Sequence, residues 1–311
     1  MDQDQVNGEA GYHRPVLGDE VVELMAPALP GVVVDATFGG GGHTRRMLDE
    51  FGDDVTIIAI DRDPEAVATA TGIGATVVQG NFADIDVIVE TVTTEPISGV
   101  LFDFGVSSHQ LDVAERGFSY HREGPLDMRM GPDAALTAAD IVNTWPAEDI
   151  ARVIRRHGEE PLARRIAGAI VAARPITSTA HLSTVIAQAM PAARRRAGHP
   201  ARRTFQAIRI AVNAELEAVA SGLEKAIDMV RPGGRVVALS YHSLEDRIVK
   251  QQFNERARGC TCPPELPVCG CGNTSEVRVL TRKPIRAGAD EVAANPRARS
   301  AVLRAVEKLA S

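Results

Sequence analysis

The sequence has 311 residues, of which 44% are hydrophobic and 24% charged, and its formal net charge is −7 at pH 7. This composition is that of a soluble globular protein with enough apolar residues for about two domains. It excludes a membrane-spanning protein, because no apolar run approaches the roughly 20 residues that a span needs. The acidic start of the chain, residues 1–11, lacks the features of a signal peptide, so we expect a disordered tail on a cytoplasmic protein.

Residues 32–104 alternate short apolar runs with longer amphipathic ones. The runs that read as strands are GVVVDA, VTIIAID, ATVVQG and GVLFDFG, and those that read as helices are HTRRMLDEF, DPEAVATATG and DIDVIVETVTT. Continuous β-branched runs are expected where both faces of a sheet are covered. Strands that alternate with helices therefore indicate an α/β fold with a parallel sheet.

The pattern changes after Ser108. Residues 111–133 have the glycines of a loop, residues 136–213 are helical, and the last helical run continues from 202 to 230. A strand pattern returns at RPGGRVVALSY, residues 231–241. We therefore expect one α/β domain built from residues 12–112 and 214–311, interrupted by an all-helical insert, residues 113–213, that recognises the substrate.

Much of the positive charge is clustered in the predicted insert. Residues 155–209 contain eleven arginines, no lysine and two glutamates, and six of these arginines lie within residues 193–209. Such a segment can bind nucleic-acid phosphates even on an acidic protein. Two other interpretations remain open, a solvated helix face and a general preference for arginine, since only four of the 34 basic residues are lysines.

Four consecutive glycines, Gly39 to Gly42, follow an apolar run that ends at Asp35. Glycine lets the chain turn sharply and lets a ligand contact the main chain. The helix that starts near His43 or Thr44 points its free N–H groups at the same place. A turn of this kind binds nucleotide-type ligands in two families, the dinucleotide-binding Rossmann domains and the S-adenosylmethionine (SAM) methyltransferases.

The ends of the following strands carry residues that suit either ligand. Asp61 can accept hydrogen bonds from two ribose hydroxyls, whereas a capping role before the next helix fits Asp63 better. Phe82 can cover an adenine face or pack in the core, and Asp103 can contact the amino acid part of a cofactor or the acceptor. The later turn in RPGG favours a methyltransferase over a dehydrogenase.

Nine motifs in this order closely resemble one known family: HRPVL, DATFGGGGH, AIDRDP, DFGVSS, ERGFSY, GPLDMRM, TFQAIRI, SYHSLEDRIVK and NPRARSAVLR. The family is that of the bacterial 16S ribosomal RNA (cytosine-N4) methyltransferases of the RsmH/MraW type, and the resemblance runs from His13 to Arg304. It implies a class I SAM-dependent methyltransferase, with a Rossmann-like, mostly parallel doubly wound sheet and an inserted helical domain. It also implies methylation of the exocyclic N4 amine of a cytidine in the decoding region of 16S rRNA.

The resemblance further implies which residues contact SAM: Gly41, Gly42, His43, Asp61, Phe82, Asp103 and Gln110. The partner that it implies is 16S rRNA within the small ribosomal subunit, and we expect neither a membrane nor DNA as a partner. DNA amino-methyltransferases carry a proline-containing motif after the fourth strand, which this chain replaces with DFGV, so their catalytic residues cannot be transferred.

The acceptor side is therefore predicted from position alone. The candidates are Asp103 and the SYHS segment, Ser240 to Ser243, in which Ser240 and His242 are the predicted catalytic residues. They follow strand ends that meet at the carboxyl edge of the sheet, where open α/β folds bind ligands. Oxygen acceptors near the N4 hydrogens would withdraw the charge that develops there. An alternative role for His242 is that of a helix-start residue.

The four cysteines form a C-x-C-x6-C-x-C motif, and they are Cys260, Cys262, Cys269 and Cys271. Four thiolates so close in sequence predict a candidate structural zinc site, although paired zinc ligands usually have two or more residues between them. A disulfide clip and free thiols are the alternatives, and a cytoplasmic location argues against disulfides.

Two other functions remain open at this point. A Rossmann dehydrogenase predicts binding of a nicotinamide dinucleotide, and a non-catalytic RNA-binding factor predicts the same fold without methyl transfer. The arginine-rich insert and the RPGG turn argue against the dehydrogenase.

Overall fold

The computed structural model describes residues 15–195, 198–260, 262 and 270–310, and these form two compact units. The first unit contains the described residues up to Asp61, together with Glu65–Phe104 and those from Ala220 onward. The second unit contains Arg62–Pro64 and Gly105–Val219. The predicted insert, residues 113–213, lies within this second unit, whose bounds are wider.

The first unit is built on a sheet of seven strands among the described residues, in the order β3-β2-β1-β4-β5-β7-β6. Strands β1 to β5 are parallel, and β7 is antiparallel to both β5 and β6. The strands are β1 (Gly31–Asp35), β2 (Val55–Asp61), β3 (Thr76–Gln79), β4 (Ile97–Asp103), β5 (Val230–Ser240), β6 (Val277–Val279) and β7 (Val302–Lys308). This mostly parallel sheet confirms the predicted class I methyltransferase fold.

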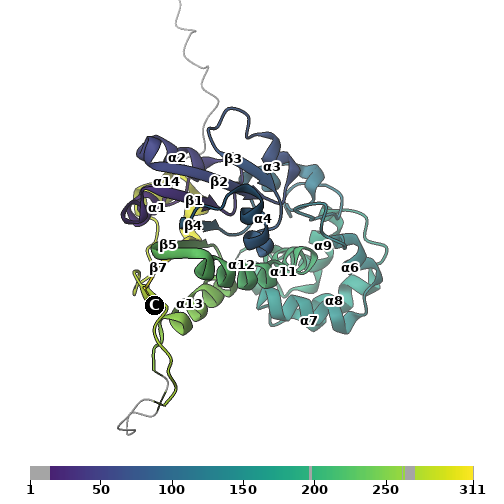
Figure 1. Cartoon of the computed structure of the whole chain (residues 1–311). Coiled ribbons are helices and arrows are strands. Elements are labelled where there is room, and N and C mark those ends of the chain that lie inside the picture. Colours follow the sequence, from purple (N-terminus) through teal and green to yellow (C-terminus); the bar gives the residue numbers. More distant parts are fainter. Residues whose placement is uncertain (1–14, 196–197, 261, 263–269, 311) are drawn as a thin grey trace, which may run out of the picture. The chain divides into compact units, whose positions relative to one another are not determined.

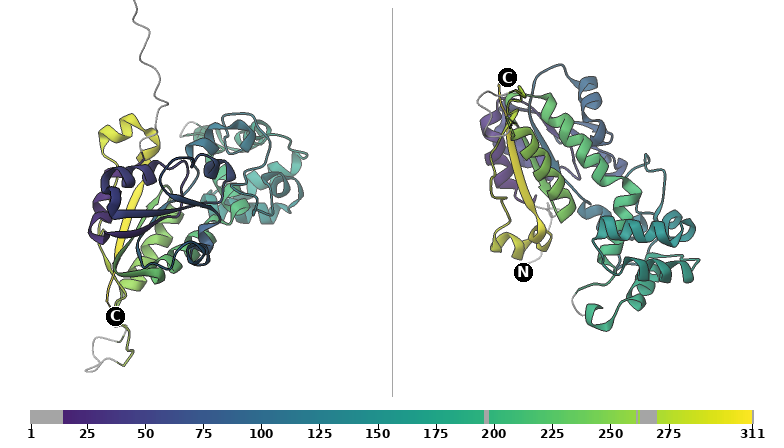
Figure 2. Two further views of the ribbon diagram at one scale, coloured as in Figure 1. Left: turned by 45° about the horizontal axis from the view of Figure 1, so that its top comes forward. Right: turned by 90° about the horizontal axis from the view of Figure 1, so that it is seen from below.

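Helices cover both faces of the sheet (Figures 1 and 2). One face carries α1 (Gly18–Met25), α2 (Gly42–Phe51) and α14 (Ala289–Ala294), and the other carries α4 (Ile85–Val92), α13 (Ser243–Ala257) and the later part of α12 (Glu215–Met229). The short helix α3 (Pro64–Ala68) links β2 to β3. Because both faces are covered, the central strands β1 and β4 are buried along almost their whole length, as their continuous apolar runs predict, whereas β3 at the edge of the sheet is partly exposed.

The core of the first unit joins the sheet to α1 and α2. Met25 and Met47 are fully buried and pack in one cluster with Val33, Ile57 and Leu101. Burial of each such side chain stabilises the fold by about 1.5–3 kcal/mol. The strands are thereby fixed in register, and the carboxyl ends of the five parallel strands meet at one edge of the sheet.

The second unit is helical apart from its loops and has a core of its own. Its helices are α5 (Ser108–Asp112), α6 (Ala138–Thr144), α7 (Ala147–Gly158), α8 (Ala163–Ala172), α9 (Thr179–Ala189), α10 (Ala192–Arg195), α11 (Arg202–Asn213) and the first part of α12. No helix in the described residues is long and apolar enough to cross a membrane.

The predicted loop, residues 111–133, is confirmed apart from its first residues, which hold the end of α5 and a 3₁₀ turn at Ala114–Arg116. Ser107 and Gln110 form the capping box that starts α5. One local prediction was wrong. The predicted helical run from 202 to 230 is broken at Ala214, which has a φ of 49°. The buried Asn213 causes this break, since its amide bonds to the main chain of Met128 and Met130 at 2.7 and 2.8 Å.

Candidate active site

The glycine turn lies between the end of β1 and the start of α2. Gly39, Gly40 and Gly41 have φ values of 60°, 142° and 78°, which L side chains rarely adopt. The Gly40 and Gly41 N–H groups both donate to the Phe38 carbonyl at 2.7 Å. A Cβ atom at Gly41 would lie 2.4 Å from Ile73 Cδ1, so glycine is required there by space as well as by conformation. Gly42 is the first residue of α2.

Asp61, at the end of β2, is oriented by this turn. Its Oδ2 accepts the Gly39 N–H at 2.7 Å, and its main-chain carbonyl accepts the Gly80 N–H at 2.9 Å. A carboxylate that accepts a main-chain N–H is held in a defined direction. The ends of β1, β2 and β3 are thus joined at the place where the sequence predicts the cofactor ribose.

Asp35 has a structural role instead. It is 1% exposed, and its carboxyl group accepts hydrogen bonds from Thr44 Oγ1 at 2.6 Å and from the Thr37 N–H at 3.3 Å. Burial raises the pKa of this carboxyl above its ordinary value, although the Thr44 hydrogen bond opposes the shift. Asp35 therefore links the end of β1 to the first turn of α2, and its bonds to Thr37 and Thr44 hold the two ends of the glycine turn.

Asp103, at the end of β4, connects three segments. Its Oδ1 accepts the Tyr241 hydroxyl hydrogen at 2.8 Å, its Oδ2 lies 3.5 Å from His43 Nε2, and its main-chain N–H donates to Thr37 Oγ1 at 2.6 Å. The Asp103 side chain is still 26% exposed, whereas that of His43 is 7% exposed. The carboxylate is therefore fixed by its neighbours and still open to a ligand.

The neighbours of Asp103 have shifted pKa values. Burial raises the pKa of Tyr241 well above its ordinary value, and the Asp103 charge adds to the shift, so the hydroxyl stays a donor at neutral pH. Burial alone lowers the pKa of His43, but the Asp103 carboxylate and the charge of Asp35 raise it by more. The pKa of His43 accordingly lies above its ordinary value, and the pair with Asp103 favours the charged ring.

Tyr241 lies within the candidate segment Ser240 to Ser243 but was given no role of its own, and Thr37 was not singled out from the sequence. Both occur in motifs of the family resemblance, SYHSLEDRIVK and DATFGGGGH. The motifs mark these residues, but they do not reveal that both bind to Asp103. The Tyr241–Asp103 bond joins residues 138 positions apart.

Ser240 and His242 flank Tyr241 and differ in their surroundings. Ser240 is 1% exposed, and its Oγ has no hydrogen-bond partner among the described residues. His242 is the N-cap of α13: its Nδ1 accepts the Glu245 N–H at 3.4 Å, and its Nε2 lies 3.0 Å from Glu245 Oε1. His242 thus has the capping role foreseen as an alternative, and the catalytic roles of both residues stay predictions.

Phe82 starts the 3₁₀ turn that follows β3. Its ring lies 5.7 Å, centroid to centroid, from the rings of both Phe102 and Phe104, and Gly222 of α12 packs so close that a Cβ atom there would lie 2.8 Å from Phe82 Cδ2. The residue is only partly buried. It therefore packs in an aromatic cluster and also offers ring surface beside the carboxyl edge.

Gln110 belongs to the second unit, and its side-chain amide makes hydrogen bonds within that unit. Its Nε2 donates to Asp63 Oδ2 at 2.8 Å, and its Oε1 accepts the Ser107 N–H at 3.1 Å. Asp63 is 2% exposed and also binds Arg116 at 2.8 Å. The described contacts make Gln110 a capping and bridging residue of the second unit, and its contact with SAM stays a prediction.

The arginines of residues 155–209 whose side chains the structure describes divide into two groups, and the side chains of Arg195 and Arg196 lie outside this description. Arg174 and Arg209 have internal partners: Arg174 donates to the Val142 and Trp145 carbonyls, and Arg209 forms a two-point pair with Glu215 at 2.8 and 2.7 Å. Others are exposed on their helices, and they include Arg155, Arg156, Arg164, Arg165, Arg194, Arg202 and Arg203. The exposed group carries the charge that phosphates can reach.

An aromatic cluster in the second unit was not predicted. The Tyr120 ring stacks on the His199 ring at 4.3 Å, and His121 lies 4.4 Å from Tyr120 and 4.7 Å from His199. Burial and the His121 charge lower the pKa of His199, so its ring is neutral at pH 7. Partly exposed, stacked rings are a surface on which an unpaired base can stack.

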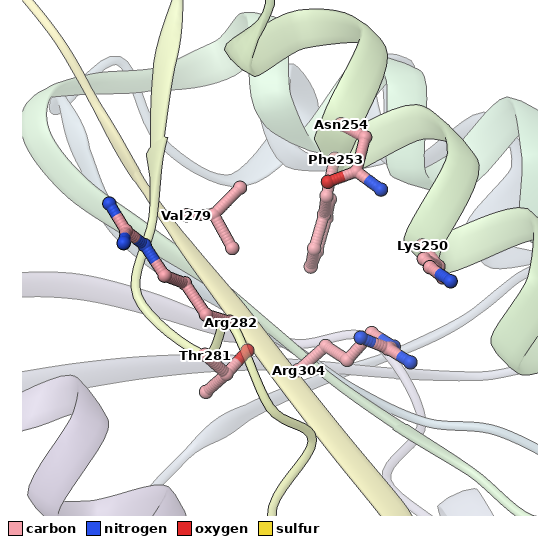
Figure 3. A pocket seen from close by; sticks show the side chains of 7 residues that line it. All are labelled: Lys250, Phe253, Asn254, Val279, Thr281, Arg282 and Arg304. Carbon is pink, nitrogen blue, oxygen red and sulfur yellow. The ribbon is translucent and has the colours of Figure 1, made fainter.

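A separate pocket of about 280 Å³ lies between α13 and strands β6 and β7 (Figure 3). Phe253 and Val279 line its apolar part, and Lys250, Arg282 and Arg304 surround it. Asp246 neutralises Arg304 through bonds of 2.6 and 3.1 Å. None of the predicted site residues lines this pocket, so it is distinct from the carboxyl edge of the sheet.

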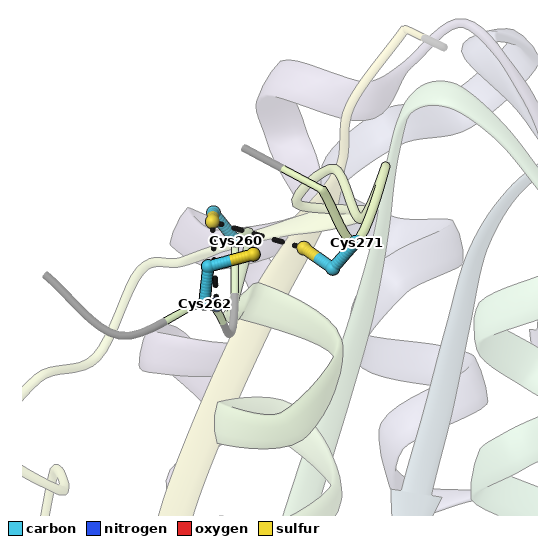
Figure 4. A group of neighbouring side chains, drawn as sticks. All are labelled: Cys260, Cys262 and Cys271. Atoms are coloured by element: carbon cyan, nitrogen blue, oxygen red, sulfur yellow. Dashed lines mark hydrogen bonds between the residues drawn. The ribbon is translucent and has the colours of Figure 1, made fainter. Parts of the chain in front are cut away.

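Three of the four cysteines lie together beyond the end of α13 (Figure 4). The Sγ atoms of Cys260, Cys262 and Cys271 are all within 4.8 Å of one another. Cys269, the fourth residue of the predicted zinc set, lies outside the described residues.

Comparison of the sequence with known proteins identifies the family to which the chain belongs. The sequence profile of the MraW methylase family matches residues 10–309. The chain belongs to the MraW methylase family. The dehydrogenase alternative is thereby excluded, and the resemblance seen in the sequence is confirmed.

Two relatives of this methylase share the name ribosomal RNA small subunit methyltransferase H. The one from Symbiobacterium thermophilum is 52% identical over 310 residues, covering 96% of this chain and 98% of the relative. The one from Geobacter sulfurreducens is 50% identical over 307 residues, covering 96% of this chain and 99% of the relative. A solved rRNA methylase from Streptococcus thermophilus is 12% identical, covers 97% of this chain and 100% of its own, and has a TM-score of 0.42.

Proposed function

We propose that this methylase transfers a methyl group from SAM to the exocyclic N4 amine of a cytidine in the decoding region of 16S rRNA, in the small ribosomal subunit of the cytoplasm. The relatives' names support small-subunit rRNA as the substrate class. The observation that carries the proposal is the juxtaposition, at one sheet edge, of the glycine turn, the oriented Asp61 carboxylate and the partly exposed Asp103 carboxylate.

The residues at this edge fit SAM. Gly40 has a φ of 142°, and no atom lies within 4 Å of the place where its Cβ would be, so the turn presents bare main chain to open space. Asp61 would hold the ribose hydroxyls, Phe82 would cover the adenine, and Gly41, Gly42 and His43 would line the amino acid part. When bound there, SAM supplies an electrophilic methyl group on a sulfonium sulfur.

Asp103 is proposed to bind the N4 amine of the target base. The N4 lone pair is delocalised into the ring, so the amine is a poor nucleophile, and alignment with the methyl group can lower the barrier by about 7–11 kcal/mol. A carboxylate oxygen that accepts an N4 hydrogen favours a pyramidal nitrogen and stabilises its developing charge. As the N4–methyl bond forms and the sulfur–methyl bond breaks, one N4 proton is released to Asp103 or to water.

Tyr241 and His43 position this carboxylate. The Tyr241 hydroxyl donates to Oδ1, and the His43 ring lies beside Oδ2, so both oxygens of Asp103 have a fixed direction. Since its raised pKa keeps Tyr241 protonated, the hydroxyl remains a donor throughout the reaction. In this mechanism neither Tyr241 nor His43 removes a proton from the substrate.

RNA binding is assigned to the second unit. Its exposed arginines supply phosphate contacts, and its Tyr120–His199 stack supplies a surface for an unstacked base. A base that undergoes chemistry has to leave its stack, and this costs least in loops and single-stranded RNA. The decoding region as target is therefore consistent with the surface that this unit offers.

The test is methyl transfer from tritiated SAM, with whole small subunits and naked 16S rRNA as separate acceptors. We expect label in RNA from at least one acceptor. If neither acceptor is labelled although the protein binds SAM and RNA, the methylase fold serves as a non-catalytic RNA-binding factor and the proposal fails.

The Asp103→Asn variant separates the two roles open to Asp103. We expect turnover to fall by about 100-fold or more, as when a charged transition-state contact is lost, while the Kd for SAM changes little. A loss of SAM affinity with normal turnover at saturating SAM would instead assign Asp103 to the cofactor. The isosteric variant keeps the shape of the side chain, so the fold is preserved in the comparison.

A further inference from the structure

The cysteine motif has no part in the proposed methyl transfer, and the structure gives three of its thiols a common centre. Cys260 Sγ and Cys271 Sγ are 3.7 Å apart, and Cys262 Sγ is within 4.8 Å of both. Figure 4 shows the three side chains converging from two neighbouring segments of chain.

The sulfur separations fit a shared metal ion. A tetrahedral zinc ion with Zn–S bonds of about 2.3 Å places its sulfurs about 3.8 Å apart. Disulfide-bonded sulfurs are only about 2.05 Å apart. The Cys271 thiol donates a hydrogen bond to Cys260 Sγ at 3.7 Å, and this separation also matches that of two ligands on one ion.

Main-chain N–H groups are directed at the sulfurs. The Cys262 N–H donates to Cys260 Sγ, and the Gly270 N–H donates to Cys262 Sγ, both at 3.4 Å. Donors of this kind stabilise the negative charge of thiolates and orient them as metal ligands. The local backbone is therefore arranged for charged sulfur.

The described parts of the surrounding chain contribute no residue to a core. The two described arms, residues 258–260 with 262 and residues 270–276, contain no buried residue and project from the end of α13 (Figure 1). Their base is tied by the Arg256–Glu276 pair at 2.5 Å and by the Glu276 N–H to the Arg256 carbonyl at 2.9 Å. Segments without a core need a cross-link, and a structural metal is one that does not depend on oxidation.

We propose that Cys260, Cys262 and Cys271 bind one structural zinc ion, which fixes the arms as a rigid projection. Thiolates are soft ligands that select zinc, and zinc undergoes no redox change. Each thiol that binds releases its proton, and the three thiolates with Zn²⁺ carry a net charge of −1. A tetrahedral zinc ion would need one further donor beside these three thiolates.

The first test is the metal content of the full-length protein, purified in reductant without chelator and with its affinity tag removed. We expect about one zinc ion per chain. X-ray absorption should show at least three sulfur neighbours, and cobalt exchanged into the site should give the intense visible bands of a tetrahedral thiolate complex. Protein that carries no zinc and has freely reactive thiols, or that has a disulfide, would overturn the proposal.

Variants on the same arms provide the control. We expect Cys271→Ser to lose the zinc, and trypsin to cut this variant faster after Arg258 because the arms are no longer fixed. Ser275→Ala, which removes the bond from Ser275 Oγ to the Ala257 carbonyl but no thiol, should keep its zinc. Full zinc occupancy in Cys271→Ser would refute the site. Metal content is measured without SAM or RNA, so this result is independent of the proposed methyl transfer.

Discussion

At the scale of single residues, Asp103 and the glycine turn determine the candidate site. Asp103 contacts Thr37 after β1, His43 in the first turn of α2 and Tyr241 after β5, all at the carboxyl edge. The glycines leave the main chain bare at the place where Asp61 is oriented. These contacts make two residue-level predictions possible.

Gly41→Ala should destabilise the first unit. The added Cβ would lie 2.4 Å from Ile73 Cδ1 and 2.7 Å from Phe38 Cε2, at a φ of 78°. Left-handed backbone costs about 1–2 kcal/mol and overpacking a similar amount, so we expect a loss of about 2–4 kcal/mol in the free energy of unfolding. Gly168→Ala is the control, because it lies in α8 with open space around it and should stabilise by about 1 kcal/mol. Equal effects in urea denaturation would contradict this account of the turn.

His43 should make the stability of the protein depend on pH. Its pKa is higher in the folded state than in the unfolded chain, so its stabilising contribution is complete below the unfolded pKa and is lost as the pH rises through the folded pKa. We therefore expect the difference in unfolding free energy between wild type and His43→Gln to be larger at pH 6 than at pH 8.5. A difference that grows with pH would show that the Asp103 charge does not raise the pKa of His43.

At the scale of secondary-structure elements, the carboxyl edge could be predicted because parallel strands end on the same side. The alternation of strands and helices is enough to place Asp61, Phe82 and Asp103 together. The side-chain partners of these residues could not be predicted in this way. The Tyr241–Asp103 bond joins residues 138 positions apart and depends on the register of β5 beside β4. The break after Asn213 has the same origin, because its cause is a tertiary contact with Met128 and Met130 that helical periodicity does not reveal.

The start of α13 offers a prediction at this scale. His242 caps the helix, and Glu245 returns its carboxylate to the Tyr241 and His242 N–H groups at 2.8 and 3.2 Å. His242→Ala should lower the unfolding free energy by about 0.5–2 kcal/mol, whereas His242→Asn, which keeps an N-cap acceptor, should be nearly neutral. If methyl transfer is lost in a stable His242→Asn protein, His242 acts on the substrate as well as on the helix.

At the scale of the whole molecule, an acidic protein presents one arginine-rich unit. The sequence reveals the cluster of arginines but not which of them are exposed. Arg174 and Arg209 have internal roles because folding brings main-chain carbonyls and the Glu215 carboxylate to them. We expect the exposed members to bind RNA phosphates.

Replacing Arg164, Arg165 and Arg202 with glutamine should weaken RNA binding and reduce the slope of log K against log salt by about one for each lost phosphate contact. The affinity for SAM should not change. Arg278→Gln, on β6 and 62% exposed, is a matched control that should leave the slope as it is. A salt slope that is unchanged in the triple variant would place the phosphate contacts elsewhere.

The chemical identity of the product tests the central claim most directly. Small subunits from cells that lack this methylase would be incubated with the protein and SAM, and the 16S rRNA digested and analysed as nucleosides by mass spectrometry. We predict N4-methylcytidine at a single position in the decoding region, formed by wild type and strongly reduced with Asp103→Asn. A methyl group on carbon 5 or ring nitrogen 3 of cytosine, or on another base, would contradict an acceptor site built around the Asp103 carboxylate.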